Sequence, residues 1–230
     1  MARRIRFIMM SWLPENISIE GEEIDFLFYI SYYLTVVVFI LVAVAMGYFI
    51  IKYRARPGVK AKYTHGNNVL EILWTVIPTF ILLVFILMTQ TSWAKLKLAI
   101  PQNPRVRVEV TGKQFNWIVR YPGDDGKFGT KDDLVLDNQL NVPVNKQVFI
   151  ALKGADVIHS FFVPQARMKQ DVVPGRTIPL WFTPTKVGKY EIPCAELCGF
   201  GHSGMNGEFI VHSEEDYAKW RKKAWAEKDK

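Results

Sequence analysis

Two long uninterrupted apolar stretches dominate the first part of the chain. Residues 26–51 and 72–94 contain no charged side chain. Each is longer than the ~20 residues that an α-helix needs to cross the hydrocarbon core of a bilayer. Neither has a polar face to turn toward water, as a helix on a globular surface would. The pattern predicts a transmembrane hairpin over 26–94, with spans at about 26–51 and 70–94 after an N-terminal tail over 1–25.

The charges around these spans predict their orientation. The loop between them has basic but no acidic residues: Lys52, Arg54, Arg56, Lys60 and Lys62. The segment before the first span is acidic, with Glu15, Glu20, Glu22, Glu23 and Asp25. Short cytoplasmic loops carry an excess of Lys and Arg, so we expect this loop inside and both chain ends outside. The basic start, with Arg3, Arg4 and Arg6, precedes too few apolar residues for a signal peptide, and we interpret it as an ordinary tail.

Beyond residue 94 the pattern changes to alternation. In the stretch 105–111, Val106, Val108 and Val110 share one face, with polar residues on the other, as in a half-buried strand. Similar short runs, separated by Pro and Gly turns, occur at 114–121, 146–152, 177–182, 188–193 and 207–212. Such spacing predicts an all-β Greek-key sandwich or barrel over 95–212.

The last stretch, 213–230, has the pattern of an amphipathic helix. Ser213 is a suitable N-cap, and acidic residues fill the first turn, where the helix dipole favours them. Tyr217, Trp220 and Ala224 fall on one face. We expect a closing helix that packs on the β-domain or on a neighbouring subunit.

Composition supports a composite protein. The 230 residues are 50% hydrophobic, with a mean hydropathy of +0.06, between the values of soluble and fully embedded chains. The net charge of +7 and pI near 9.3 raise the question of nucleic acid. The positive charge is divided among the loop between the spans and the two termini, without a binding motif or interleaved aromatics. We therefore expect membrane lipid and not nucleic acid as a partner.

The chemistry concentrates in one short loop, Cys194-Ala-Glu-Leu-Cys198-Gly-Phe-Gly-His202-Ser-Gly-Met205. Soft sulfur donors together with imidazole select copper over hard cations. His159 is the natural source of a second imidazole. A disulfide between the two cysteines and a zinc site are the alternatives. A disulfide has no use for the histidine and methionine, and a thioether is a poor zinc ligand, so copper is favoured.

The motif Cys-x-Glu-x-Cys-Gly-x-x-His-x-x-Met, with Asp-Val-Ile-His-Ser-Phe upstream, closely resembles the binuclear copper A site of subunit II of haem-copper cytochrome c oxidases. The resemblance covers almost the whole chain and implies a cupredoxin fold. It implies that Cys194 and Cys198 bridge two coppers. His159 and His202 are each implied to bind one copper. Met205 and the backbone carbonyl of Glu196 are implied to be weak axial ligands. The Glu196 side chain is implied to reach a magnesium ion shared with subunit I, a role that suits a carboxylate.

The implied function is that of the subunit where electrons enter a respiratory oxidase. Copper A accepts electrons from cytochrome c and passes them to haem in subunit I, where dioxygen is reduced to water and protons are pumped. The copper domain then lies on the periplasmic side of a bacterial-type cell membrane, beside subunit I and other oxidase subunits. The chain has no Cys-x-x-Cys-His, so the donor is a separate cytochrome c or a tethered cytochrome. The alternatives are a metal-free scaffold subunit of a quinol oxidase and a copper chaperone.

Four further residues match the family less closely. Glu71, in Glu-x-x-Trp-Thr-x-x-Pro, resembles the glutamate at the mouth of the K proton pathway, although a helix-start carboxylate near the membrane surface would look the same. Asp171 resembles a carboxylate that faces subunit I near the haem propionates, or is a satisfied interfacial aspartate. Phe115 stands where the family has the tryptophan through which electrons enter, so we expect a different docking geometry. We expect Trp117, assigned with Phe115 to this region, to support the core beneath the copper loop.

The loop 124–133 contains four aspartates and several glycines. Its spacing does not match a 12-residue EF-hand and has no closing glutamate. A solvated hairpin tip is favoured over a calcium site, and the loop is also a candidate acidic rim for a basic cytochrome. His65 and His212 lack partners at ligand spacing, and we expect both at the surface.

Overall fold

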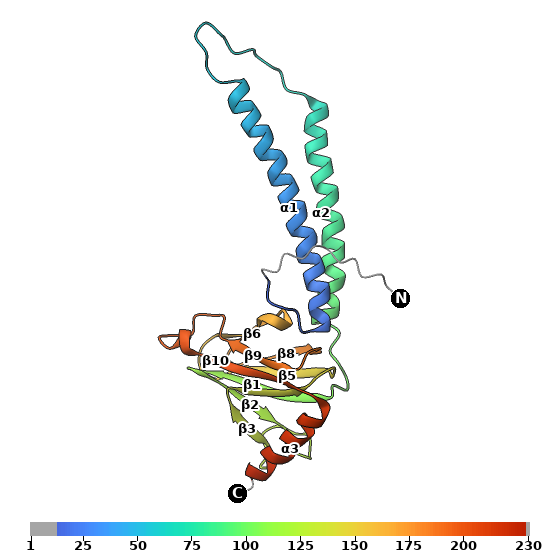
Figure 1. The fold of residues 1–230 in the computed structure, drawn as a ribbon, viewed down its shortest axis with the longest axis vertical. Coiled ribbons are helices and arrows are strands. Elements are labelled where there is room, and N and C mark those ends of the chain that lie inside the picture. The colour runs from blue at the N-terminus through green and yellow to red at the C-terminus, as the bar shows by residue number, and fades with distance from the viewer. Residues whose placement is uncertain (1–12, 229–230) are drawn as a thin grey trace. The chain divides into compact units, whose positions relative to one another are not determined.

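A computed structural model describes residues 13–228. The described residues form two compact units (Figure 1). One is the helical unit Glu23–Lys95, and the other, a β-domain, combines the residues up to Glu22 with those from Leu96 onward. Arg3, Arg4 and Arg6 lie outside the described residues.

The two helices α1 (Ile19–Lys52) and α2 (Asn68–Lys97) are each long and apolar enough to cross a membrane. Most of their large apolar side chains are exposed in the isolated chain. Apolar surface of this extent is unfavourable in water and is covered by lipid or by other helices. Where the start of α1 lies beside the end of α2 (Figure 1), the Ser92 hydroxyl donates a hydrogen bond of 2.6 Å to Glu23 Oε1. The two predicted apolar helices are confirmed.

Helix α1 begins before the apolar run, at a cap anchored in the β-domain. Ser18 Oγ accepts the Gly21 N–H at 2.9 Å, as an N-cap serine does, and donates to the Ala166 carbonyl at 2.7 Å. The preceding Ile17 is fully buried, and its N–H donates to the Gln165 carbonyl at 2.9 Å. The described segment ahead of α1 is therefore packed into the β-domain.

The β-domain consists of two main sheets and a strand pair. The larger sheet has the order β3-β2-β1-β5-β8, the smaller has β4-β10-β9, and β6 pairs with β7. The pairs β1–β5 and β4–β10 are parallel and the others antiparallel. The strands are β1 (Val106–Lys113), β2 (Asn116–Tyr121), β3 (Leu134–Asp137), β4 (Gln139–Pro143), β5 (Val148–Gly154), β6 (His159–Val163), β7 (Met168–Val172), β8 (Thr177–Phe182), β9 (Gly188–Pro193) and β10 (Asn206–His212).

The core lies between the two main sheets. Strand β1 alternates as its sequence predicts, and its valines at 106, 108 and 110 are buried. Trp117 on β2 is fully buried, and its indole N–H donates to the Ile192 carbonyl on β9 at 3.0 Å. The rings of Phe182 and Phe209, from β8 and β10, lie 5.5 Å apart in an edge-to-face arrangement. The predicted all-β sandwich is confirmed.

Helix α3 (Glu214–Lys228) covers the end of β10 and corrects one expectation. Trp220 stacks on His212 with ring centroids 6.0 Å apart, and His212 shares a 2.8 Å hydrogen bond with Asn141 Oδ1. Burial under the helix lowers the pKa of His212. The expectation of a surface histidine was wrong, because its contacts come from residues distant in sequence.

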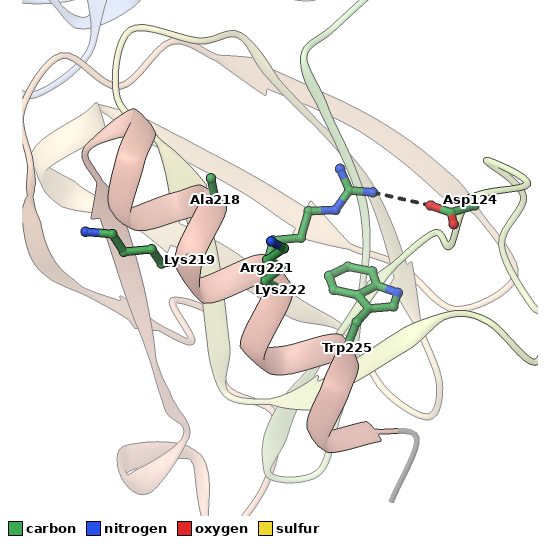
Figure 2. A pocket seen from close by; sticks show the side chains of 6 residues that line it. All are labelled: Asp124, Ala218, Lys219, Arg221, Lys222 and Trp225. Carbon is green, nitrogen blue, oxygen red and sulfur yellow. Dashed lines mark ion pairs between the residues drawn. The ribbon is translucent and has the colours of Figure 1, made fainter.

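A hollow of about 850 Å³ lies beside α3 (Figure 2). It is lined by Asp124, Ala218, Lys219, Arg221, Lys222 and Trp225. Arg221 Nη2 approaches Asp124 Oδ1 at 3.9 Å, but both side chains are largely exposed, and such ion pairs contribute little to stability. The hollow contains none of the residues expected to bind metal.

The buried hydroxyl of Tyr121 predicts a measurable loss of stability. It donates to the Asn141 carbonyl at 3.0 Å and accepts the Asn141 N–H at 2.6 Å. Tyr121→Phe leaves these buried groups without that partner, and we expect the free energy of unfolding to fall by about 1–3 kcal/mol. Urea unfolding of the detergent-solubilised chain, followed by tryptophan fluorescence, measures the change.

The control is Tyr190→Phe. The Tyr190 hydroxyl makes a longer, exposed hydrogen bond of 3.3 Å to the Lys186 carbonyl, so its loss should cost less than about 0.5 kcal/mol. Equal losses in the two variants would contradict the role of the Tyr121 hydroxyl.

Candidate metal centre

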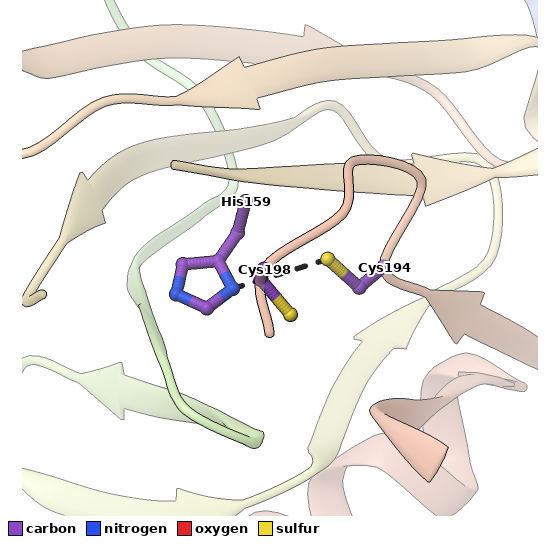
Figure 3. A group of neighbouring side chains, drawn as sticks. All are labelled: His159, Cys194 and Cys198. Atoms are coloured by element: carbon purple, nitrogen blue, oxygen red, sulfur yellow. Dashed lines mark hydrogen bonds between the residues drawn. The ribbon is translucent and has the colours of Figure 1, made fainter. Parts of the chain in front are cut away.

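Two cysteines and a histidine converge at one end of the sandwich (Figure 3). Cys194 and Cys198 belong to the segment that joins β9 to β10, and His159 is the first residue of β6. Both thiols are free, all three residues are buried, and one ligand atom from each lies within 4.8 Å of the others. Within residues 13–228, this is the only group of three or more such side chains close enough to hold a metal ion.

The two imidazoles approach different sulfurs. His159 Nδ1 lies 3.9 Å from Cys194 Sγ, and His202 Nδ1 lies 3.6 Å from Cys198 Sγ. His202 opens the short helix η2 (His202–Gly204) within the same connecting segment. The centre therefore has one imidazole near each thiol.

Each sulfur also has one weaker donor atom near it. Cys194 Sγ lies 3.2 Å from the carbonyl oxygen of Glu196, and Cys198 Sγ lies 3.7 Å from Met205 Sδ. The ends of the loop are held together by the Cys194 N–H, which donates to the Met205 carbonyl at 3.0 Å. Each of the other four residues expected as copper ligands thus has a donor atom within 3.9 Å of one of the two sulfurs.

Asp156 fixes the orientation of His159. Its carboxylate accepts from His159 Nε2 at 2.8 Å, so this nitrogen carries the proton and Nδ1 directs its lone pair toward the sulfurs. Burial opposes ionisation of Asp156, but N–H groups of Gln114 and Val157 and the His159 ring outweigh it and lower its pKa to about 2. The ring therefore has a charged acceptor at neutral pH.

The donor set fits a soft cation. Burial, together with the neighbouring Cys194, raises the pKa of Cys198 to about 11. Two thiolates so close together require positive charge between them, and a bound metal deprotonates coordinating thiols. Two thiols, two imidazoles and a thioether are the soft and borderline ligands that copper prefers.

The residues expected where electrons enter occupy different depths. Trp117 is fully buried, with its ring 6.0 Å from that of His159 and 5.6 Å from that of Phe161. Phe115 is 40% exposed, and its ring lies over Gly201 of the ligand loop. Phe200, within the loop, is fully exposed.

The other candidate residues differ in their surroundings. Glu71 is in the first turn of α2, in the helical unit, where Asn67 Oδ1 caps the helix by accepting the N–H groups of Val69 and Leu70. Asp171, on β7, accepts a 2.8 Å hydrogen bond from the buried Ser160, beside His159. The Glu196 residue is exposed.

The acidic loop uses its carboxylates in its own hydrogen bonds. Asp133 accepts the Gly129 N–H at 2.7 Å and pairs with Arg120 at 3.1 Å, and Asp132 accepts from Thr130 Oγ1 at 2.6 Å. These bonds form a folded turn, as the hairpin-tip interpretation expects.

Two residues of the site were missed by sequence reasoning. Asp156 appeared only as part of a motif, and Gln114 had no assigned role. The Gln114 side chain donates to the Cys198 carbonyl at 2.6 Å, although 84 positions separate the two residues. No local pattern carries such a contact.

The arrangement defines a membrane-anchored cupredoxin-type domain with a sulfur-rich metal loop. Residues 106–211 match the family described as cytochrome c oxidase subunit II, periplasmic domain, and residues 9–90 match its transmembrane domain. The chain belongs to the subunit II family of cytochrome c oxidase, and thus to an oxidoreductase complex whose subunit II family binds copper.

Similar proteins span most of the chain. The alternative cytochrome c oxidase subunit 2 of Bradyrhizobium diazoefficiens is 31% identical, over 91% of this chain and 82% of that protein. The cytochrome c oxidase subunit 2 of Cereibacter sphaeroides is 34% identical, over 83% of this chain and 71% of the relative. The crystal structure of the periplasmic domain of subunit II from Bradyrhizobium japonicum aligns with a TM-score of 0.49 and 31% identity, over 56% of this chain and 99% of that domain.

The contact between Asp156 and His159 predicts weaker copper binding after a single isosteric change. Asp156→Asn removes the charged acceptor that holds the ring, and losing such an outer partner typically lowers metal affinity by about 10–100-fold. Chelator competition with the purified protein, with copper measured by atomic absorption, tests this.

Asp124→Asn is the matched control, because Asp124 is exposed and belongs to the acidic loop. Equal chelator resistance in the wild type and Asp156→Asn would remove Asp156 from the site.

Proposed function

We propose that this chain is the subunit through which electrons enter a cytochrome c oxidase, and that its six converging residues bind binuclear copper A. The observation that carries the proposal is the division of donors: each sulfur has its own imidazole and its own weak donor nearby. Two metals bridged by two sulfurs need such a duplicated set, whereas one tetrahedral ion does not.

The protein's contribution is to hold these donors rigidly. Strand ends support the ligands, the Cys194–Met205 backbone bond closes the loop, and Asp156 holds the His159 ring. When bound, the copper pair supplies a one-electron relay between a cytochrome donor and haem in subunit I. A rigid donor set changes its geometry little between redox states, so the reorganisation energy of electron transfer stays small.

Two other functions are less consistent with these residues. A metal-free scaffold subunit of a quinol oxidase has no need for a buried pair of free thiols, which desolvation disfavours as thiolates. A copper chaperone has no need for a duplicated donor set or for two membrane helices.

The wider assembly follows from the same assignment. We propose that α1 and α2 cross a bacterial-type cell membrane with the basic loop in the cytoplasm, so that the copper domain faces the periplasm. The exposed Glu196 carboxylate is suited to magnesium at a contact with subunit I. Asp171 is assigned to the same contact, and Phe115 and Phe200 to the face that meets a soluble or tethered cytochrome.

Glu71 is proposed to mark the start of a proton pathway into subunit I. It lies at the N-terminal end of α2, which is the cytoplasmic end in this orientation, and is exposed in the isolated chain. Ionisable groups at membrane depth are usually functional.

Removing either thiol should destroy the bridged centre. In the purified oxidase, Cys194→Ser or Cys198→Ser should abolish the near-infrared absorption and the EPR signal of an electron shared by two coppers. Donor oxidation should stop while the chain stays in the membrane. Ser203→Ala, in the same loop, is the control and should retain both signals. A cysteine variant with full copper content and normal turnover would contradict bridging.

Glu71→Ala should slow proton uptake without slowing electron input. Steady turnover and the proton-coupled haem reduction steps should slow, whereas rapid-mixing oxidation of the donor should keep its wild-type rate. Glu215→Ala removes an exposed carboxylate from the first turn of α3 and controls for loss of a helix-start charge. Normal turnover in Glu71→Ala would contradict the proton-pathway role, and Glu71 would then be only a carboxylate at the start of a helix.

A further inference from the structure

We infer that Gln114 is a positioning residue that clamps the two halves of the metal centre to each other. Gln114 lies in the turn between β1 and β2, outside both ligand-bearing segments. Its backbone bonds to the segment that carries His159, and its side chain bonds to the loop that carries Cys198.

The first contact reaches the histidine through Asp156. The Gln114 N–H donates to Asp156 Oδ2 at 2.8 Å, and Asp156 Oδ1 accepts from His159 Nε2, also at 2.8 Å. The two oxygens of one carboxylate thus connect the turn to the imidazole. Because the carboxylate bonds to both groups, rotation of the ring away from its position breaks the hydrogen bond that links it to the turn.

The second contact reaches the cysteine loop directly. Gln114 Nε2 donates to the Cys198 carbonyl oxygen at 2.6 Å, three residues before the loop's second glycine, Gly201. Gly199 has a φ of +136°, and a Cβ there would lie 2.7 Å from Gln114 Nε2. Only glycine permits this approach of the amide to the loop.

Phe115 extends the clamp along the loop. A Cβ added to Gly201 would lie 2.6 Å from Phe115 Cδ2, so the ring packs directly on the loop backbone. The β1–β2 turn therefore contacts the ligand loop on both sides of the exposed Phe200. These contacts support a loop that is not part of a strand. The Gln114 hydrogen bond fixes the position of the loop relative to the turn. The Phe115 ring alone would not, because an aromatic ring can slide along the backbone it packs on.

A positioning role predicts changes in the metal's properties, not merely in stability. Gln114→Leu keeps the approximate size and the backbone N–H but removes the amide donor. In the copper-loaded oxidase we expect about tenfold faster loss of copper to a chelator, in the range found for outer-shell partners. We also expect a shifted reduction potential and altered copper hyperfine splitting. Gln139→Leu, on the exposed start of β4, is the control and should change none of these.

A readout without copper tests the clamp itself. In the metal-free full-length chain in detergent, Gln114→Leu should speed hydrogen exchange at the amides of His202 and Met205, while amides of the β1–β5 ladder keep their protection. Gln114→Asn, whose amide is one methylene too short, should behave like Gln114→Leu. This second variant keeps the test valid if one substitution misfolds.

The copper readouts rest on the proposed function, but the exchange readout does not. Wild-type protein without a shared-electron copper signal would overturn the proposed function and leave the exchange test standing. Normal wild-type copper signals, together with unchanged potential, chelator resistance and loop exchange in both Gln114 variants, would overturn the clamp alone.

Discussion

The structure depends on keeping two thiols close together in a buried site. One ligand atom each of Cys194, Cys198 and His159 lies within 4.8 Å of the others, and burial together with the neighbouring Cys194 raises the pKa of the Cys198 thiol. Thiolates are stable in such a place only with compensating positive charge. The neighbouring features serve this requirement: the closed loop between β9 and β10, the start of β6, the oriented imidazole and the supporting turn.

The expected ligand His159 comes from β6, distant in sequence from the loop that carries the other five, so the sandwich determines where they meet. Trp117 connects the sheets directly beneath the site, through the Ile192 carbonyl and the edges of the His159 and Phe161 rings. The Phe161–Cys194 backbone bridge brings β6 against the start of the ligand loop. A rigid core of this kind supports the site from within the β-domain.

Sequence patterns predicted the features that repeat locally. Continuous apolar runs predicted both helices, and the valines of β1 predicted a half-buried strand. Strand β4 was not predicted from the sequence, because all its residues after Gln139 are buried, including Asn141, and the alternation of apolar and polar residues is lost. Strand β7, Met-Lys-Gln-Asp-Val, has a largely polar centre that resembles a loop.

Motif spacing predicted that Cys194, Cys198, His202 and Met205 lie close together, because these four residues belong to one short loop. The supporting contacts were not predictable, since Gln114 meets Asp156 and Cys198 across 42 and 84 positions. His212 was placed at the surface for the same reason: Asn141 and Trp220 reach it only in the folded domain. Local chemistry is thus visible in the sequence, whereas the contacts that orient it depend on topology.

The central claim is that the six converging residues hold two coppers that share one electron. The most direct measurement combines the copper-to-chain ratio with EPR of the purified wild-type oxidase. The account predicts two coppers per chain in this domain, with a hyperfine pattern from two equivalent copper nuclei. A single copper with the pattern of one nucleus, a bound zinc ion, or a stable disulfide between Cys194 and Cys198 in the active oxidase would contradict it.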